Sequence, residues 1–207
     1  SVDVPAGYTT LFVFPYSVGF QFSGFKNLAA LNEAITKRLK NLGVTTLLFM
    51  RHLELIEYEI KIPGKEASGE YLLDAEPVND HCTRVSAIES EDDKTDESLS
   101  FIKFSMPIDS RVSTRTIDVA FTVATDKEGK TTFQKAKNPY ISVYFPTETE
   151  SKLDFIVQGP FRTTPNRSSV PADEEENEAL AEQTAKLLRQ SVLELRDMGL
   201  LDLSLIR

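Results

Sequence analysis

Residues 145–171 read FPTETESKLDFIVQGPFRTTPNRSSVP and predict a β-strand that leads directly into a basic loop. Apolar side chains alternate over residues 153–158, which is the two-residue period of a strand with one buried face. A Gly-Pro pair then ends the pattern. Arg162 and Arg167 follow among threonines, serines and an asparagine, without a carboxylate. In a chain with a net charge of −9, this loop is the segment best suited to an anionic ligand.

A long helix is predicted directly after this loop. Residues 173–198 begin with the acidic run DEEENE and continue with apolar side chains at helical spacing. Asp173 and Glu176 have the spacing of a capping box, and Gly199 is typical of a helix end. The basic loop is therefore expected to run into the N-terminus of a helix.

Two interpretations of Arg162 and Arg167 follow from this placement. A guanidinium on a stiff loop near a helix N-terminus is suited to a phosphate, and it can neutralise charge that develops on a γ-phosphate. Alternatively, both side chains pair with the acids of residues 173–178 or bond to nearby carbonyls, which is a structural role. The residues alone leave both interpretations open.

The rest of the chain predicts an α+β fold. Leucine and isoleucine recur at helical spacing over residues 27–43, with Asn27 as the N-cap and Gly43 at the C-terminal end. Strands are expected at residues 8–16, 45–50, 55–62, 71–75, 83–88, 99–106, 114–125, 131–135, 140–145 and 153–158. The acidic stretch 89–97 is expected to be a solvated loop, and residues 126–129 a hairpin turn. This order predicts one mixed or antiparallel sheet with helices packed on one face.

Composition excludes several classes of protein. The 207 residues, 41% of them hydrophobic, are enough for one substantial core or two small ones. The acidic balance disfavours nucleic-acid binding, and no apolar run is long enough for a transmembrane helix. The N-terminal residues lack the pattern of a signal peptide, and the single cysteine, Cys82, fits a reducing compartment. We therefore expect a cytoplasmic or nuclear protein. Because the chain begins at Ser1 and not at methionine, we also expect it to be part of a longer protein.

Few other residues suggest catalysis. His52, His81 and Cys82 lack a further ligand at the spacing of a zinc site, so no metal site is expected. Neighbouring strand residues such as His81 and Cys82 point to opposite faces, which argues against a catalytic pair. No Walker loop, dinucleotide fingerprint or serine-hydrolase elbow is present. An arginine that acts on a nucleotide would therefore need that nucleotide to be held outside this chain.

The segment KLDFIVQGPFRTTPNRSSVP, followed by ENEALAEQTAKLL and LRDMGLL, resembles the region after the ATPase domain in sacsin-like and bacterial GHKL ATPases, relatives of heat shock protein 90. GYTTLFVFPY is similar to the closing strand of such an ATP-binding domain, and TTLLFMRHLELIEY to the first strand of its middle, or transducer, domain. The resemblance covers most of residues 7–201. Its specific parts are QGPFRTTPNR and LLFMRHLELIEY, whereas residues 63–138 match in pattern alone.

The resemblance implies a division of the chain and a set of site residues. Residues 1–24 would end a preceding ATP-binding domain, and residues 25–207 would form the middle domain. In these families a basic residue on a loop of the middle domain reaches the γ-phosphate of ATP. Arg167 is the best match to this residue and Arg162 the second, and Gln158 and Asn166 would support or orient the loop at the cofactor.

The resemblance also implies cofactors and partners. ATP and Mg²⁺ would be bound mainly upstream, because the acidic-Asn helix and DxGxG motif of these families are absent from this chain. The chain alone would then be inactive and would dock with its own N-terminal ATPase domain. Chaperone, DNA-linked and defence roles all occur on this ATPase scaffold, so the resemblance leaves open which role the parent has, whether it acts on protein clients and whether it is a homodimer. The alternative is a non-catalytic protein-interaction module. A nucleic-acid-binding module is a third interpretation, which the negative charge disfavours.

Overall fold

The computed structural model describes residues 24–62, 64–92, 94–109, 112–137 and 139–201. The chain divides into two compact units, Ser1–Leu42 and Gly43–Arg207, and each is described by itself. The strand predicted at residues 8–16 lies outside the described residues. The assignment of residues 1–24 to a preceding domain stays a prediction.

Helix α1 (Leu28–Lys40) is the helix predicted from the apolar period of residues 27–43. Asn27 is its N-cap, and the Asn27 side-chain oxygen accepts a hydrogen bond from a backbone N–H of the first turn at 2.9 Å. The helix ends earlier than predicted. The side chain of Asn41 donates to a carbonyl of the last turn at 2.6 Å, so Asn41 and not Gly43 closes the helix.

Residues 45–50 were expected to form a strand, and this prediction is wrong, because they form a series of turns. Three of their backbone N–H groups donate to carbonyls three residues earlier. Leu47, Leu48 and Phe49 are nevertheless buried and pack in a cluster with side chains of the sheet. A short run of apolar residues predicts that the segment is buried. It is too uniform to show the period that would distinguish a strand from a buried turn.

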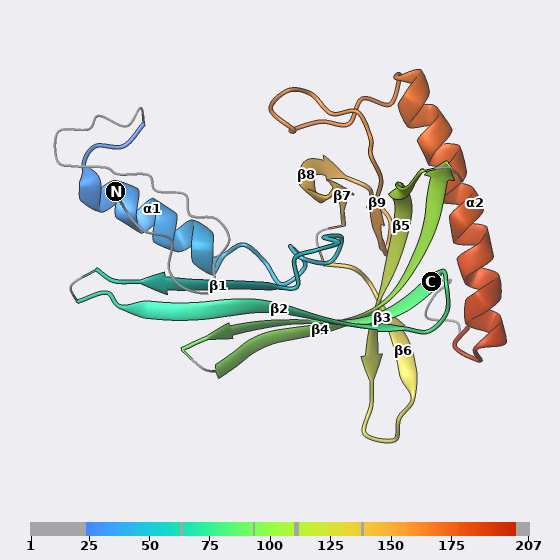
Figure 1. Cartoon of the computed structure of the whole chain (residues 1–207), viewed down its shortest axis with the longest axis horizontal. Coiled ribbons are helices and arrows are strands. Elements are labelled where there is room, and N and C mark those ends of the chain that lie inside the picture. Colours follow the sequence, from blue (N-terminus) through green and yellow to red (C-terminus); the bar gives the residue numbers. More distant parts are fainter. Residues whose placement is uncertain (1–23, 63, 93, 110–111, 138, 202–207) are drawn as a thin grey trace. The chain divides into compact units, whose positions relative to one another are not determined.

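The described residues of the second unit form a nine-stranded sheet. Its strands are β1 (Leu55–Ile60), β2 (Ala67–Pro77), β3 (Cys82–Glu91), β4 (Lys94–Asp109), β5 (Val112–Thr125), β6 (Thr131–Gln134), β7 (Tyr140–Val143), β8 (Phe145–Glu150) and β9 (Ile156–Gln158). Consecutive strands from β1 to β6 pair antiparallel. The order across the sheet is β1-β2-β3-β4-β5-β9-β7-β8, and β6 pairs with β5 beside β9 (Figure 1).

The acidic stretch 89–97 forms a hairpin and not the open loop that its charge predicts. β3 extends to Glu91, and β4 begins at Lys94. Asp92 lies in the turn with a φ of 48°, and its Oδ1 accepts a hydrogen bond from the N–H of Ser68 at 3.1 Å. Pairing with neighbouring strands overrides the low strand propensity of these acidic residues.

The strands before the basic loop also differ from the prediction. Residues 140–145 are not one strand, because Tyr144 has a φ of 64° and separates β7 from β8, which was not predicted. β9 is shorter than the predicted strand 153–158, and all its residues are buried because a cluster covers each of its faces. β9 pairs antiparallel with β5 and parallel with β7, so the sheet is mixed.

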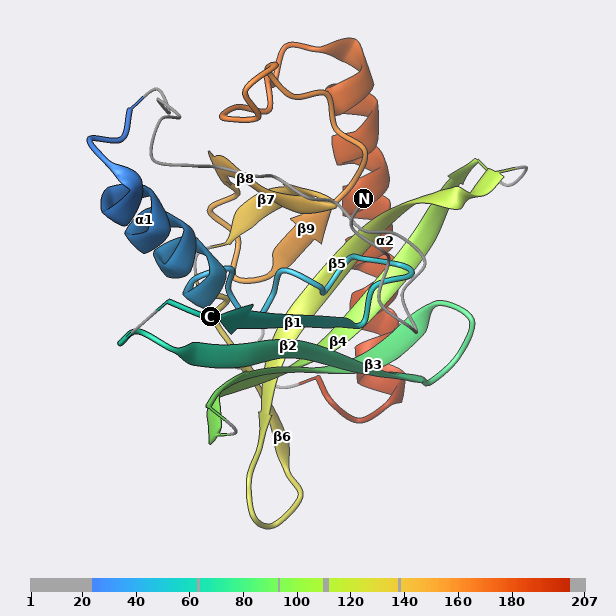
Figure 2. The same cartoon turned by 60° about the vertical axis from the view of Figure 1, so that its left-hand side comes forward.

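Two hydrophobic clusters cover the two faces of the sheet. The neighbouring residues Phe101 and Ile102 of β4 belong to different clusters, and neighbouring strand residues point to opposite faces. Helix α2 (Glu175–Asp197) contacts β4 and β5 and buries Leu180, Leu187 and Leu195 against one face (Figure 2). The opposite face is covered by the turns of residues 43–50. A mixed sheet with a helix on one face confirms the predicted α+β class.

The two ends of α2 are closed in different ways. The predicted capping box at Asp173 is wrong, because the N-cap is Glu174 and it makes no side-chain capping bond. At the other end, Gly199 has a φ of 72°, and its N–H donates to the Arg196 carbonyl while the N–H of Leu200 donates to the Leu195 carbonyl, both at 2.9 Å. These two bonds form a Schellman motif, so the predicted helix end at Gly199 is confirmed. No helix in the described part of the chain is long and apolar enough to cross a bilayer.

Candidate functional site: the basic loop

The loop that carries the two arginines leaves the sheet at the end of β9. The N–H of Gly159 donates to the Ser142 carbonyl at 3.1 Å, which extends the pairing of β9 with β7. Phe161 then enters the core under α2. A Cβ at Gly159 would lie 2.8 Å from the Phe161 ring, so the turn into the loop needs a glycine here.

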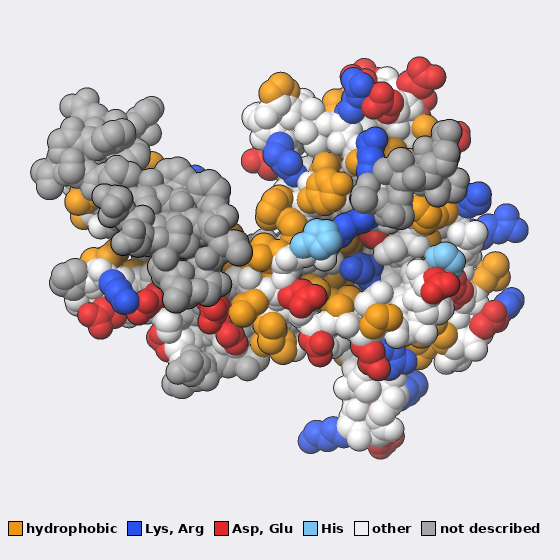
Figure 3. Space-filling view, viewed as in Figure 1, with side chains coloured by type: hydrophobic (Ala, Val, Ile, Leu, Met, Phe, Trp, Pro, Cys, Tyr) orange, Lys and Arg blue, Asp and Glu red, His pale blue; other side chains and the backbone are white. Residues whose placement is uncertain are grey.

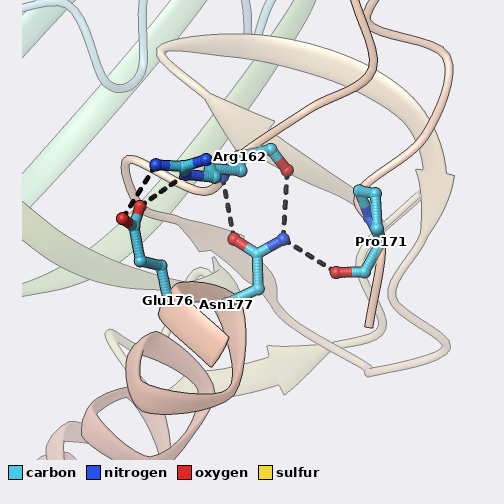
Figure 4. A network of polar contacts seen from close by, with 4 residues as sticks. All are labelled: Arg162, Pro171, Glu176 and Asn177. Carbon is cyan, nitrogen blue, oxygen red and sulfur yellow. Dashed lines mark hydrogen bonds and ion pairs between the residues drawn. The ribbon is translucent and has the colours of Figure 1, made fainter. Parts of the chain in front are cut away.

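Asn177, in the first turn of α2, holds both ends of the loop (Figure 4). Its Oδ1 accepts a hydrogen bond from the N–H of Arg162 at 2.8 Å. Its Nδ2 donates to the carbonyls of Arg162 at 3.1 Å and Pro171 at 2.8 Å. The side chain is buried, with 4% of its surface exposed. One amide therefore fixes the start and the end of the loop on the helix.

Polar side chains close the tip of the loop, residues 164–169. The N–H of Arg167 donates to the Thr164 carbonyl at 2.8 Å, which makes a turn around Pro165. Asn166 Oδ1 accepts hydrogen bonds from the hydroxyls of Thr164 at 2.8 Å and Ser168 at 2.9 Å. Asn166, predicted to support the loop at the cofactor, thus bonds within the loop itself.

Arg167 lies at this tip in a left-handed backbone conformation, with a φ of 60°. Its guanidinium Nη2 donates to the carbonyls of Val143 at 2.8 Å and Phe145 at 3.4 Å, at the break between β7 and β8. The side chain is exposed, and no carboxylate of the described residues forms an ion pair with it. The positive charge of Arg167 is therefore held in place by neutral partners.

Arg162 has a different environment, although its side chain is exposed too. Its Nε and Nη2 atoms form a two-point ion pair with the Glu176 carboxylate, at 2.6 and 2.9 Å (Figure 4). This contact raises the pKa of Arg162 and lowers the pKa of Glu176. The charge of Arg162 is thus balanced within the chain.

Each arginine has one of the structural partners considered for it in the sequence: an acid for Arg162 and backbone carbonyls for Arg167. The positive end of the α2 dipole faces Glu175, Glu176 and Glu178 in the first turn, and these carboxylates would repel a phosphate. An anion is therefore better placed at Arg167 than at the helix N-terminus.

Gln158, the last residue of β9, belongs to a row of polar side chains that crosses four strands. Asp118 pairs with Ser105 on one side and with Gln158 on the other, and Gln158 pairs with Ser142. Gln158 is 2% exposed, and its Oε1 is the one buried side-chain oxygen or nitrogen of the described residues without a hydrogen-bond partner. The row ends next to Val143, whose carbonyl binds Arg167. Gln158 is therefore a buried residue at the base of the loop and does not lie at its exposed tip.

Asp118 is the acidic member of this row, and it lies near two cations. Its side chain is buried and accepts hydrogen bonds from Ser105 and from the Thr116 hydroxyl, the latter at 3.0 Å. Burial raises the pKa of Asp118, and the charges of Lys103 and Arg51 oppose this shift. Burial also lowers the pKa of Lys103, whose Nζ donates to the Leu48 carbonyl at 3.3 Å. The two charged groups thus share a low-dielectric part of the sheet.

We predict that Asp118→Asn changes the pH dependence of stability. Because burial raises the pKa of Asp118 above its ordinary value of 3.8, the folded state binds this proton more tightly than the unfolded state. The stabilisation that this proton provides is fully present below the pKa that Asp118 has in the unfolded chain. It is lost as the pH rises through the pKa that Asp118 has in the folded protein. The wild type should therefore lose free energy of unfolding relative to the variant as the pH rises above the ordinary pKa of an aspartate, measured by urea unfolding at a series of pH values. A relative gain over that range would contradict the assignment.

The other residues that were considered from the sequence as catalytic or metal-binding groups do not form a site. His52 and His81 are both exposed, and burial raises the pKa of the Cys82 thiol to about 11, which makes it a poor nucleophile. Among the described residues, no group of His, Cys, Asp and Glu side chains could hold a metal ion. Two surface hollows, at the β1–β2 hairpin and over β2 to β5, are not lined by the loop arginines.

Sequence reasoning missed Asn177 and Asp118. The run DEEENE predicted an acidic helix start and acidic partners for the loop arginines, whereas its one amide, Asn177, was the available signal for the contact to the loop. Asp118 interrupts an apolar strand, TIDVAFTV, and a lone carboxylate in such a strand indicates a polar contact across the sheet. In both cases the hydrogen-bond partners come from distant segments. The sequence therefore shows that the residue is unusual for its position, but it does not show which groups the residue contacts.

Comparison of the chain with protein-family models, with curated proteins and with solved structures returned no match. The assignment of a function therefore depends on the chain's own residues and their geometry.

Proposed function

We propose that this chain is the middle domain of a GHKL ATPase of the heat shock protein 90 and sacsin type. In this proposal Arg167 contacts the γ-phosphate of an ATP molecule bound to a preceding domain, and the middle domain transmits the resulting conformational change. The observation that carries the proposal is the exposed guanidinium of Arg167, which is held on a preformed loop by neutral carbonyls only. The sequence resemblance supports the same residue.

A phosphate is a better partner for Arg167 than its present ones. A phosphate oxygen carries negative charge, so it attracts the guanidinium more strongly than a neutral carbonyl oxygen does. The guanidinium can therefore leave the carbonyls of Val143 and Phe145 for a phosphate without breaking an ion pair. Arg162 would first have to release Glu176, so it is the weaker candidate.

The preceding domain would supply the nucleotide site, Mg²⁺ and the group that activates water. This chain would contribute the positive charge that stabilises the transferring phosphoryl group. Gln158 is too deeply buried to touch a phosphate in the present arrangement, so we assign it a supporting position at the base of the loop. Asn166 supports the turn that presents Arg167.

A non-catalytic interaction module is the second candidate. It is favoured by exposed aromatic side chains at the break between β7 and β8, where Tyr144 is 39% exposed and Phe145 is 46% exposed. Figure 3 shows hydrophobic side chains gathered over this part of the molecule. Exposed aromatic groups are enriched at protein interfaces. A partner protein could bind this surface without any contribution from Arg167 to catalysis.

The proposal predicts where ATP hydrolysis is found. This chain alone should show no turnover, because the groups that would bind Mg-ATP are expected upstream. A longer form that also contains the proposed ATP-binding domain should hydrolyse ATP. Phosphate release by the two forms measures this. Absence of turnover from both forms would favour the interaction module, and turnover by the short chain would show a nucleotide site within it.

A further inference from the structure

Asn177 makes a set of hydrogen bonds that few other side chains could make. Its oxygen accepts one bond from the loop, and its nitrogen donates two, to Arg162 and Pro171. Alanine would leave two carbonyls and one N–H without these partners. Aspartate would lose both donated bonds and place a negative charge beside the two carbonyls. Glutamine carries one more methylene, which does not fit a buried site of fixed dimensions.

These bonds fix the loop at its base, while other contacts hold its tip. The N–H of Val170 donates to the Thr149 hydroxyl at 2.9 Å, and Arg167 bonds to the carbonyls beside Tyr144. Residues 162–171 are therefore tied to α2 at both ends and to β7 and β8 through Arg167 and Val170. Closing the loop at its base reduces the number of conformations available to the tip.

The left-handed backbone of Arg167 adds a reason for this support. A residue other than glycine is unfavourable at a φ of 60°, so surrounding contacts must hold it. The tip hydrogen bonds of Asn166 and Thr164 provide part of this support. The two sides of the loop pair directly at the tip, where the N–H of Thr164 donates to the Ser169 carbonyl at 3.0 Å, and Asn177 joins them again at the base.

We propose that Asn177 is a positioning residue that preorganises the basic loop and thereby sets the position of Arg167. For catalysis this inference rests on the proposed function, because Arg167 must act on a phosphate for its position to affect the rate. The loop geometry itself does not depend on that assumption. The two parts can therefore be tested separately.

Limited proteolysis of this chain tests the loop geometry. Trypsin cleaves after arginine, so the Arg167–Ser168 bond reports how often the tip opens. Asn177→Ala and Asn177→Asp should each increase the cleavage rate at this bond about tenfold, because the loop base loses its hydrogen bonds. Glu176→Gln is the matched control. It weakens the Arg162 ion pair next to Asn177 and should change the rate less than about twofold.

Far-UV circular dichroism and thermal unfolding of each variant exclude global unfolding as the cause of faster cleavage. A rate at Arg167–Ser168 that is unchanged in both folded Asn177 variants would overturn the inference. The same increase in Glu176→Gln as in Asn177→Ala would also overturn it, since the ion pair would then hold the loop.

Steady-state ATP turnover of the longer form tests the catalytic part. Asn177→Ala should lower kcat about tenfold with little change in the KM for ATP, since Arg167 would stabilise the transition state. In the Arg167→Ala background, the same substitution should have no further effect on kcat. Equal losses in both backgrounds would overturn the inference, because a merely structural role is additive. If Arg167→Ala leaves turnover unchanged, the proposed function fails and catalytic positioning fails with it, while the proteolysis result still decides whether Asn177 orders the loop.

Discussion

Replacing Arg167 with alanine should lower kcat for ATP hydrolysis by about 10²- to 10³-fold in the longer form of the protein. The substitution removes the one loop guanidinium that no carboxylate of the described chain balances. It removes positive charge at the transferring phosphoryl group but none of the groups that would bind the nucleotide upstream. The KM for ATP should therefore change much less than kcat. Phosphate release under single-turnover and steady-state conditions measures both quantities.

Arg162→Ala is the matched control for this experiment. It removes the same kind of side chain from the same loop, but the lost contact is an exposed ion pair with Glu176. Exposed ion pairs contribute little, so turnover should fall less than about threefold. A larger loss of ATP turnover in Arg162→Ala than in Arg167→Ala would mean that Arg162, and not Arg167, contacts the phosphate. Normal turnover in both variants would leave the interaction module as the function.

Alanine is preferred to glycine at position 167. Arg167 has a left-handed backbone, which glycine adopts without strain, so glycine would change the loop's flexibility together with its charge. Alanine keeps a Cβ and so retains the backbone preference of an L-residue. The unfolding temperature of Arg167→Ala should stay close to that of the wild type, because the lost contacts lie at an exposed corner.

Phe104→Ala should have the largest effect on stability, about 3–5 kcal/mol of the free energy of unfolding. Phe104 is 1% exposed on β4 and belongs to the cluster under α2. Its ring meets that of Phe121 edge to face, with 6.1 Å between the ring centroids. Removing it leaves a cavity between the sheet and the helix that carries Asn177. Urea unfolding followed by circular dichroism measures the loss.

Phe145→Ala is the control with the same chemical change at an exposed site. Phe145 is 46% exposed at the start of β8, so its replacement should change the free energy of unfolding by about 0.5 kcal/mol or less. A similar loss in both variants would mean that Phe145 is buried in solution, for example by self-association. A small loss in Phe104→Ala would contradict the placement of α2 on the sheet.

The hairpin strands were predictable because their pattern is local. Residues 55–62 alternate in polarity, and Asp126 to Gly129 carry the turn residues that close β5 on β6. Local propensity failed where tertiary contacts overrode it. Residues 45–50 are apolar because they are buried, not because they are extended. The acidic stretch 89–97 is extended because strands pair on either side of it, although its composition favours a loop.

The loop could be found in the sequence, but its chemistry could not be assigned there. Two arginines and the lack of any carboxylate within the segment marked residues 158–171. Whether either charge was balanced depended on Glu176 and on the carbonyls of Val143 and Phe145. The packing of β7, β8 and α2 brings these partners to the loop. Because these elements are distant from the arginines in the sequence or contact them only in the folded chain, no local sequence pattern predicts the contacts.

Local sequence patterns were sufficient to predict the α+β class, the hairpin turn at residues 126–129, the helix that ends at Gly199 and the presence of a basic loop. Each of these depends on hydrophobic period, turn chemistry or local charge, which act between residues near in the chain. The packed fold was needed to show that β9 pairs with both β5 and β7, that Asn177 joins the two ends of the loop, and that an ion pair neutralises Arg162 but not Arg167. These features depend on hydrogen bonds and charges brought together from distant segments, and only the packed fold sets those distances.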